Sequence, residues 1–232
     1  MLVWNGKNSY DCNIVVQRYP ERTIAKRKYE VVSIPGRSGD LYFSQEAYEN
    51  VTQEYEVYIS AEKPKLPVMA RKAAEWLSTP GYHELWDDYD PDVFRLAYYS
   101  GAVNIENIFN QFGRMTLSFS CKPQRFLTSG KEVREFQSPG KLYNPTGFNA
   151  KPEITVFGSG SGTVTIGGTT VSLSGLSEYV VIDSDLQDAY KGTLNCNSVM
   201  TGDFPELAPG DNLISWTGGI TGVKIIPRWW VL

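Results

Sequence analysis

Hydrophobic and polar positions alternate strictly along residues 50–60, NVTQEYEVYIS. This alternation predicts a β-strand that buries one side and exposes the other. A second strand-like stretch, residues 26–34, comes earlier, and the segment IPGRSGD at residues 34–40 lies between the two. Proline and glycine in that segment favour tight turns. Residues 26–60 are therefore predicted to form a long hairpin arm with a glycine-rich tip.

The length of this arm allows two interpretations. Nine extended residues span roughly 30 Å, which is more than a small sandwich needs to cross its own core. The arm could therefore reach onto another subunit. The pattern alone favours the simpler alternative, an ordinary hairpin within one sheet.

A helix is predicted at residues 65–79. Met69, Ala73, Trp76 and Leu77 recur at helical spacing and form one apolar stripe. A proline in the first turn is tolerated, because its missing N–H would have no partner there. Three alternating segments follow up to residue 121, and they are typical of antiparallel strands.

The composition changes at residues 129–150, where proline and glycine recur. We interpret this stretch as a linker between a first domain, residues 1–128, and a second, residues 151–232. In the second domain, predicted strands recur every eight to twelve residues, which indicates a β-sandwich. GSGSG at residues 158–162 is interpreted as a hairpin turn, because a strand and not a helix follows it.

The totals fit a globular chain without a metal or disulfide framework. The 232 residues are 41% hydrophobic and 21% charged, with a net charge of −4. The negative charge argues against specific binding to nucleic acid. Three cysteines lack zinc spacing and indicate free thiols in a reducing compartment. No apolar run reaches transmembrane length, and no signal peptide is predicted.

Candidate catalytic chemistry is sparse. His83 is the one histidine, no nucleophile motif accompanies it, and no cofactor is implied. Asp87, Asp88, Asp90 and Asp92 lack the order of a calcium loop, so we expect a solvated acidic turn and no metal. A glycosidase with two convergent carboxylates stays open, although nothing favours it. The residues indicate a β-rich scaffold or binding module, not an enzyme.

The order of segments resembles a known family along nearly the whole chain. WNGKNSYDCNIVV, YEVVSIPGRSGDLYFSQEAYENVTQEYEVYI and HELWDDYDPDVFRLAYYSG carry the resemblance in the first domain. FSCKPQRF, YNPTGFNAKPEITVFGSGSGTVTIGG, EYVVIDSDLQDAY and FPELAPGDNLISW carry it further. Together they resemble the distal tail protein (Dit) family of siphophages.

The resemblance implies a mainly β fold: an N-terminal tail-tube-like domain with one helix and a long hairpin arm, and a C-terminal galectin-like β-sandwich. It implies a structural hub at the phage tail tip, in which six copies form a ring, possibly in two stacked rings, around a channel for DNA. Implied partners are the major tail tube protein, the tape measure protein, the tail-associated lysin or fibre hub, and the receptor-binding protein. The implied location is the virion, after assembly in the host bacterial cytoplasm, without membrane insertion.

The resemblance also implies that the arm embraces a neighbouring subunit. The corresponding subunit-interface residues are Tyr29, Val31, Ile34, Pro35, Gly36, Arg37, Ser38, Gly39, Asp40, Tyr55 and Val57. The alternative is a carbohydrate-binding module that recognises a host cell-surface glycan. That alternative needs exposed aromatic residues, and its candidates are Tyr179, Tyr190, Trp216 and Trp229.

Overall fold

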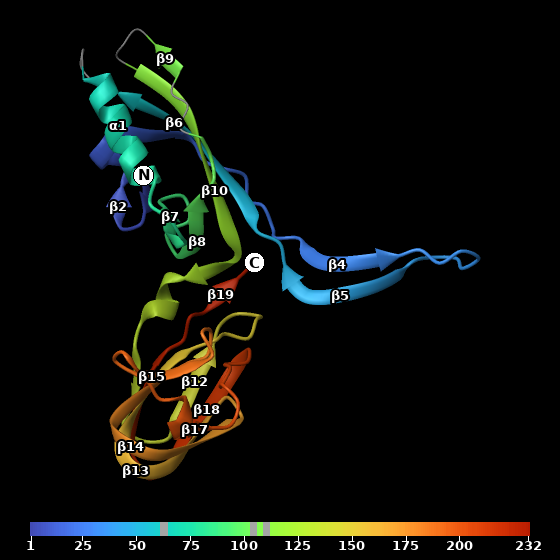
Figure 1. Ribbon diagram of the computed structural model, residues 1–232, viewed down its shortest axis with the longest axis vertical. Helices are drawn as coiled ribbons and strands as arrows, with labels where there is room; N and C mark the ends of the chain where they lie inside the picture. Colours follow the sequence, from blue (N-terminus) through green and yellow to red (C-terminus); the bar gives the residue numbers. More distant parts are fainter. Residues whose placement is uncertain (61–64, 103–105, 109–111) are drawn as a thin grey trace. The chain divides into compact units, whose positions relative to one another are not determined.

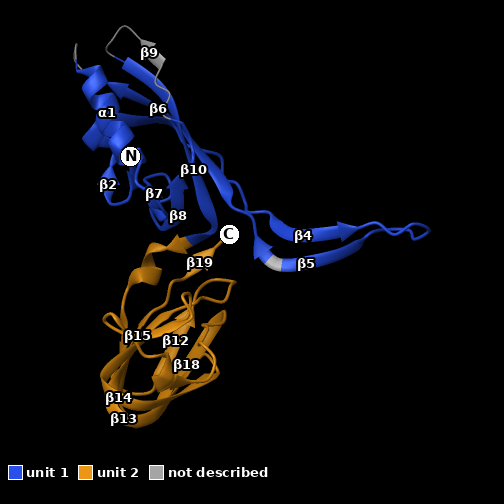
Figure 2. Cartoon of the chain, in the orientation of Figure 1, with its two compact units in different colours: residues 1–125, 232 blue, residues 126–231 orange. Residues whose placement is uncertain are grey.

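The computed structural model describes residues 1–60, 65–102, 106–108 and 112–232. The chain divides into two compact units (Figure 2). Unit 1 comprises residues 1–125 with Leu232, and unit 2 comprises residues 126–231. Both are built mainly from β-strands (Figure 1), and the described residues contain one α-helix, so the predicted mainly β class is confirmed.

Unit 1 contains one large antiparallel sheet. Its main path runs β2-β1-β7-β8-β10-β6-β3, and β9 pairs beside it with β10. The strands are β1 (Leu2–Trp4), β2 (Lys7–Asn8), β3 (Ile14–Arg18), β6 (Val51–Ser60), β7 (His83–Asp87), β8 (Val93–Tyr99), β9 (Glu106–Ile108) and β10 (Phe112–Leu127). A 3₁₀-helix, η1 (Ser9–Cys12), follows β2.

The predicted helix is confirmed as α1 (Leu66–Leu77). Ala73, Trp76 and Leu77 are buried in the core of unit 1, and Met69 packs against its edge. The indole Nε1 of Trp76 donates to the carbonyl oxygen of Trp4 at 3.1 Å. The apolar stripe read from the sequence is therefore the face that holds the helix on the sheet.

The alternation of residues 50–60 produces the other half of this core. In β6 every second side chain is buried, among them Tyr55, Val57 and Ile59. Tyr55 lies opposite Leu117 of β10, and Val57 lies opposite Met115. β6 is thus an internal strand of the sheet, between β10 and β3.

Unit 2 is built around three long strands. Its sheet runs β11-β18-β13-β14-β15-β16, with β12 on β18 and β17 on β14. The strands of this part of the chain are β11 (Arg134–Phe136), β12 (Gly140–Asn144), β13 (Glu153–Ile166), β14 (Thr169–Asp183), β15 (Asp188–Lys191), β16 (Leu194–Asn195), β17 (Met200–Thr201), β18 (Gly210–Ile226) and β19 (Trp230–Val231). The 3₁₀-helix η2 (Thr128–Lys131) precedes β11, and a second, η3 (Asn197–Val199), lies between β16 and β17. The galectin-like arrangement stays a prediction.

The glycine-rich segment 158–162 is not a hairpin turn, so that interpretation is wrong. It lies in the middle of β13, where the register against β14 and β18 shifts. A Cβ on Gly158 would lie 2.2 Å from the carbonyl oxygen of Gly219, and one on Gly162 would lie 2.4 Å from that of Thr217. Glycine is needed here because the backbones of two paired strands approach too closely for a side chain.

The stretch predicted as a linker, residues 129–150, is also different from expectation. Residues 140–144 form β12, which pairs along its whole length with β18, and β11 pairs with the other end of β18. Leu142 and Ala150 lie in the core of unit 2. Proline and glycine here mark the ends of short strands, not a flexible connection.

A buried ion pair closes one end of unit 2. The guanidinium of Arg228 donates to both carboxylate oxygens of Asp183 at 2.7 and 2.8 Å, and to Glu153 at 2.9 Å. Asp183 is 1% exposed. Burial opposes its ionisation, but hydrogen bonds from Arg228 and from the amides of Leu186 and Asp185 outweigh burial and lower the pKa of Asp183.

The change Asp183→Asn tests this ion pair. Because the folded pKa of Asp183 lies below the unfolded value of about 3.9, the pair stabilises unit 2 above that pH, and the stabilisation is lost as the pH falls through the folded pKa. We expect a loss of roughly 2–3 kcal/mol at pH 7 and a shallower fall in stability below pH ~4. Urea denaturation across this range measures both, with the exposed Asp211→Asn as control. Equal pH profiles for wild type and Asp183→Asn would contradict the assignment.

Candidate functional site

The arm is a two-stranded ribbon formed by β4 (Arg27–Val32) and β5 (Leu41–Tyr48). It is a sheet of its own, and neither strand pairs with any other described strand. Figure 2 shows it leaving the body of unit 1. Its base is closed by a hydrogen bond from the amide of Glu49 to the carbonyl oxygen of Lys26 at 2.8 Å.

The tip of the arm is set by its turn residues. The amide of Arg37 donates to the carbonyl oxygen of Ile34 at 3.1 Å. Pro35 and Gly36 stand between them, and Gly36 has a φ of 82°. This is the arrangement of a type II turn, which places proline second and requires positive φ at the third position. The predicted glycine-rich tip is therefore present and locally well defined.

Both faces of the arm carry exposed apolar side chains. Tyr29, Val31 and Tyr42 share one face, where the rings of Tyr29 and Tyr42 lie 5.0 Å apart. Val32 and Phe43 lie on the other face. These five side chains are between 37% and 57% exposed. A two-stranded ribbon is marginal in water by itself, and one with apolar residues on both faces is typical of a segment that another surface covers.

The structure divides the predicted interface residues into two groups. Nine of them are exposed in the arm and its tip: Tyr29, Val31, Ile34, Pro35, Gly36, Arg37, Ser38, Gly39 and Asp40. Tyr55 and Val57 are 2% and 0% exposed in the core of unit 1, so they do not belong to an exposed arm surface. Their assignment was wrong because the arm returns through β5, and β6 is a separate strand of the main sheet.

Three exposed large apolar residues of the arm are absent from the predicted set: Val32, Tyr42 and Phe43. A signal for them was present in the sequence. The segment LYFS directly after the turn is apolar enough to match the strand before it, and the register pairs Val31 with Tyr42 and Glu30 with Phe43.

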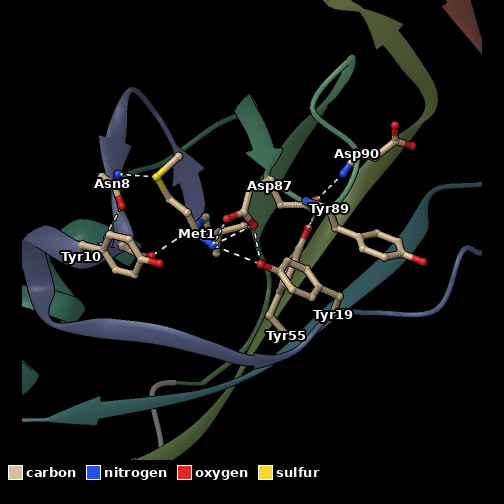
Figure 3. A network of polar contacts seen from close by, with 11 residues as sticks. Met1, Asn8, Tyr10, Tyr19, Tyr55, Asp87, Tyr89 and Asp90 are labelled. Carbon is tan, nitrogen blue, oxygen red and sulfur yellow. Dashed lines mark hydrogen bonds and ion pairs between the residues drawn. The ribbon is translucent and has the colours of Figure 1, made fainter.

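The acidic turn after β7 belongs to a polar network, seen in Figure 3. The hydroxyl of Tyr55 donates to Asp87 at 2.7 Å, and the amides of Tyr89 and Asp90 donate to the other oxygen of Asp87. Tyr19 donates to Asp88, and this hydrogen bond raises the pKa of Tyr19 to about 12. Within the described residues, no group of three or more His, Cys, Asp or Glu side chains could hold a metal ion.

The aromatic residues proposed for sugar binding do not form an exposed row. Trp229 is 3% exposed in the core of unit 2, and Trp216 packs against that core. Tyr179 and Tyr190 are half-buried. Sugar platforms use exposed aromatic faces, so these four residues give the carbohydrate-binding alternative no support.

Two comparisons with known proteins find phage tail proteins. The sequence model of the phage tail protein RIFT-related domain matches residues 11–121, most of unit 1. The crystal structure of SPP1 Dit superposes with a TM-score of 0.77 and 14% sequence identity, covering 100% of this chain and 98% of that chain. SPP1 Dit is described as a paradigm of the hub adsorption apparatus in phages that infect Gram-positive bacteria. No curated protein sequence matches the chain.

Residues 11–121 therefore carry a phage tail RIFT-related domain, and the whole chain has the mainly β fold of SPP1 Dit. The match to the phage tail domain and the shared fold of SPP1 Dit agree with the resemblance drawn from the sequence. Among the residues that the structure describes, no helix is both long and apolar enough to cross a membrane.

Proposed function

We propose that this protein is the structural hub of a siphophage tail tip. Six copies form a closed ring that joins the tail tube to the receptor-binding apparatus, and DNA passes through its channel. The observation that carries this proposal is the arm, an exposed ribbon with apolar side chains on both faces. The hub role described for SPP1 Dit, whose fold this chain shares, supports the same function.

The arm explains how such a ring would be held together. Burying a fully exposed large apolar side chain stabilises by about 1.5–3 kcal/mol, so each half-exposed arm residue contributes about 1 kcal/mol when a neighbour covers it. A ribbon that is apolar on both faces is best covered by a groove, not by a flat surface. Head-to-tail contacts of this kind close into a ring when the rotation between subunits allows it.

The channel would be lined by the outer face of β6 and β10. This face is opposite the buried core and carries Glu54, Glu56, Thr116 and Ser118. Thr116 lies opposite Glu56, and Ser118 lies opposite Glu54. Carboxylates repel phosphates, so DNA would slide past the part of the face that these four residues form without binding.

The remaining roles follow from a position at the tail tip. The ring would contact the tail tube and tape measure proteins on one side, and the lysin or fibre hub and the receptor-binding protein on the other. It would assemble in the host cytoplasm and remain in the virion. Its role would be structural and non-catalytic.

Light scattering of the purified chain tests the proposal. With a subunit mass of 26.0 kDa, we expect a particle of six subunits, or twelve for stacked rings, that persists on dilution. Specific binding to a glycan array by a stable monomer would contradict it, because a carbohydrate module needs no ring.

A further inference from the structure

A small cleft lies at the root of the arm, where β6, β7, β8 and β10 of unit 1 meet the segment that leads into β4. Gln53 and Tyr55 of β6, Arg95 of β8 and Arg125 of β10 line it. The volume open inside it is about 60 Å³, which is room for a group with the size of one carboxylate and not for a drug-sized ligand.

Arg95 is the unusual member of this cleft. Its Nη1 is buried, and it has no hydrogen-bond partner among the described residues. Burial lowers the pKa of Arg95, and nearby Arg125 lowers it further. An arginine stays charged in proteins, and a buried charged donor without a partner is costly.

The acidic groups of the cleft are occupied elsewhere. Asp90 accepts from Arg22 at 3.2 Å and from Arg125 at 3.3 Å. Both oxygens of Asp87 accept hydrogen bonds, from Tyr55 and from the amides of the following turn. Arg125 additionally donates to the main-chain oxygen of Leu232 at 2.8 Å.

The other groups in the cleft cannot supply the missing charge. Burial raises the pKa of Tyr55, which lines the cleft, well above its usual value, and raises that of Cys121, a neighbour of Arg95 outside the lining, to about 12, so both are neutral at pH 7. Glu21 lies on the exposed rim. Asp87 is close enough to favour the charge of Arg95, but its hydrogen bonds go to Tyr55 and the turn amides, so Nη1 of Arg95 is left without a partner.

The rim of the cleft belongs to the arm's connections. Pro20, Glu21 and Arg22 lie in the segment between β3 and β4. The guanidinium of Arg22 also stacks over the ring of Tyr89 at 5.5 Å. A group bound in the cleft would touch the segment from which the arm leaves unit 1, and would thereby fix it.

We propose that this cleft binds a single carboxylate, with Arg95 as its buried partner and Arg22 at its entrance. The carboxylate is either a free organic anion or an acidic side chain of a neighbouring copy. The binding chemistry is the same in both cases, because a guanidinium pairs with the planar carboxylate through two hydrogen bonds. This proposal does not depend on the ring.

Thermal denaturation of the full chain in sodium acetate and in sodium chloride, at equal ionic strength, tests the proposal. When the acetate concentration is about twenty times its Kd for the cleft, binding should raise the Tm of the protein by roughly 3–6 °C. We expect this rise in the wild type and its loss in Arg95→Met, which keeps an unbranched side chain in place. Arg95→Lys keeps the charge and should retain part of the rise.

Arg134→Met is the matched control, because Arg134 is an exposed arginine of unit 2 that pairs with Glu132. It should respond to acetate as the wild type does. If acetate also lowers the particle mass, the natural carboxylate belongs to a neighbouring copy, and if the mass is unchanged, it is a free anion. An equal response of wild type and Arg95→Met to acetate, or no response of either, would overturn the proposal.

Discussion

Replacing residues 27–48 with Asn-Gly converts the proposed ring into monomers of folded protein. The cut is placed between Lys26 and Glu49, which are already joined by a main-chain hydrogen bond at the base of the arm. An Asn-Gly pair closes such a base as a two-residue turn. Because the arm forms a sheet of its own, we expect its loss to leave the core of unit 1 intact. Light scattering measures the mass, and circular dichroism checks the fold.

A milder variant separates the arm's side chains from its backbone. The double variant Val31→Ser, Tyr42→Ser removes one apolar face and keeps the ribbon. Each contact between subunits then loses about 1.4 kcal/mol or more, so the ring should dissociate at protein concentrations at least tenfold higher than those at which the wild-type ring dissociates. Tyr143→Ser is the control, since Tyr143 is 65% exposed on a strand of unit 2. Rings that survive the loss of residues 27–48 would refute the role of the arm.

The sequence predicted the tip of the arm better than its second strand. Pro35 and Gly36 favour a tight turn by their own backbone preferences, so the turn can be predicted from these few residues alone. Alternation reports that a strand has a buried side, but it does not tell which strand is the partner. β6 alternates because it lies in the core of the main sheet, and β5 alternates less clearly because neither of its faces is buried there.

Helix α1, unlike the second strand of the arm, was predictable because its contacts are local. A helix makes its hydrogen bonds within one segment, so its stripe of Ala73, Trp76 and Leu77 contains all the information needed. The cleft of Arg95 was not predictable. The sequence shows on which side of β8 Arg95 lies. Its neighbours in the cleft, residues 22, 55 and 125, are far apart in the sequence and are brought together only by the fold.

The segment 158–162 was misread because local sequence does not distinguish a turn from a bulge. Both need glycine, and the difference lies in the strand opposite. Here that strand contains Gly218 and Gly219, about sixty positions further along the chain, and Gly162 pairs with Gly218 where the register of β13 and β18 shifts. A single sequence gives no reason to connect them.

Gly219→Ala should therefore be among the most damaging substitutions in unit 2. A Cβ at Gly219 would lie 1.8 Å from the carbonyl oxygen of Ser159, an atom of rigid backbone. The two long strands would have to separate at their bulge, at a cost of about 3–5 kcal/mol. Gly219 does not have a positive φ, so the cost comes from the close approach and not from backbone strain.

Hydrogen exchange of the full chain measures this effect locally. We expect the amides of β13 and β18 to exchange about 100-fold faster or more in Gly219→Ala, as a loss of 3 kcal/mol implies, with unit 1 unchanged. Gly147→Ala is the matched control, because Gly147 has nothing within 4 Å of an added Cβ and no positive φ. Unchanged exchange in Gly219→Ala would mean that β13 and β18 do not meet at these glycines. The glycine-rich run would then be free to act as the hairpin turn that its sequence suggests.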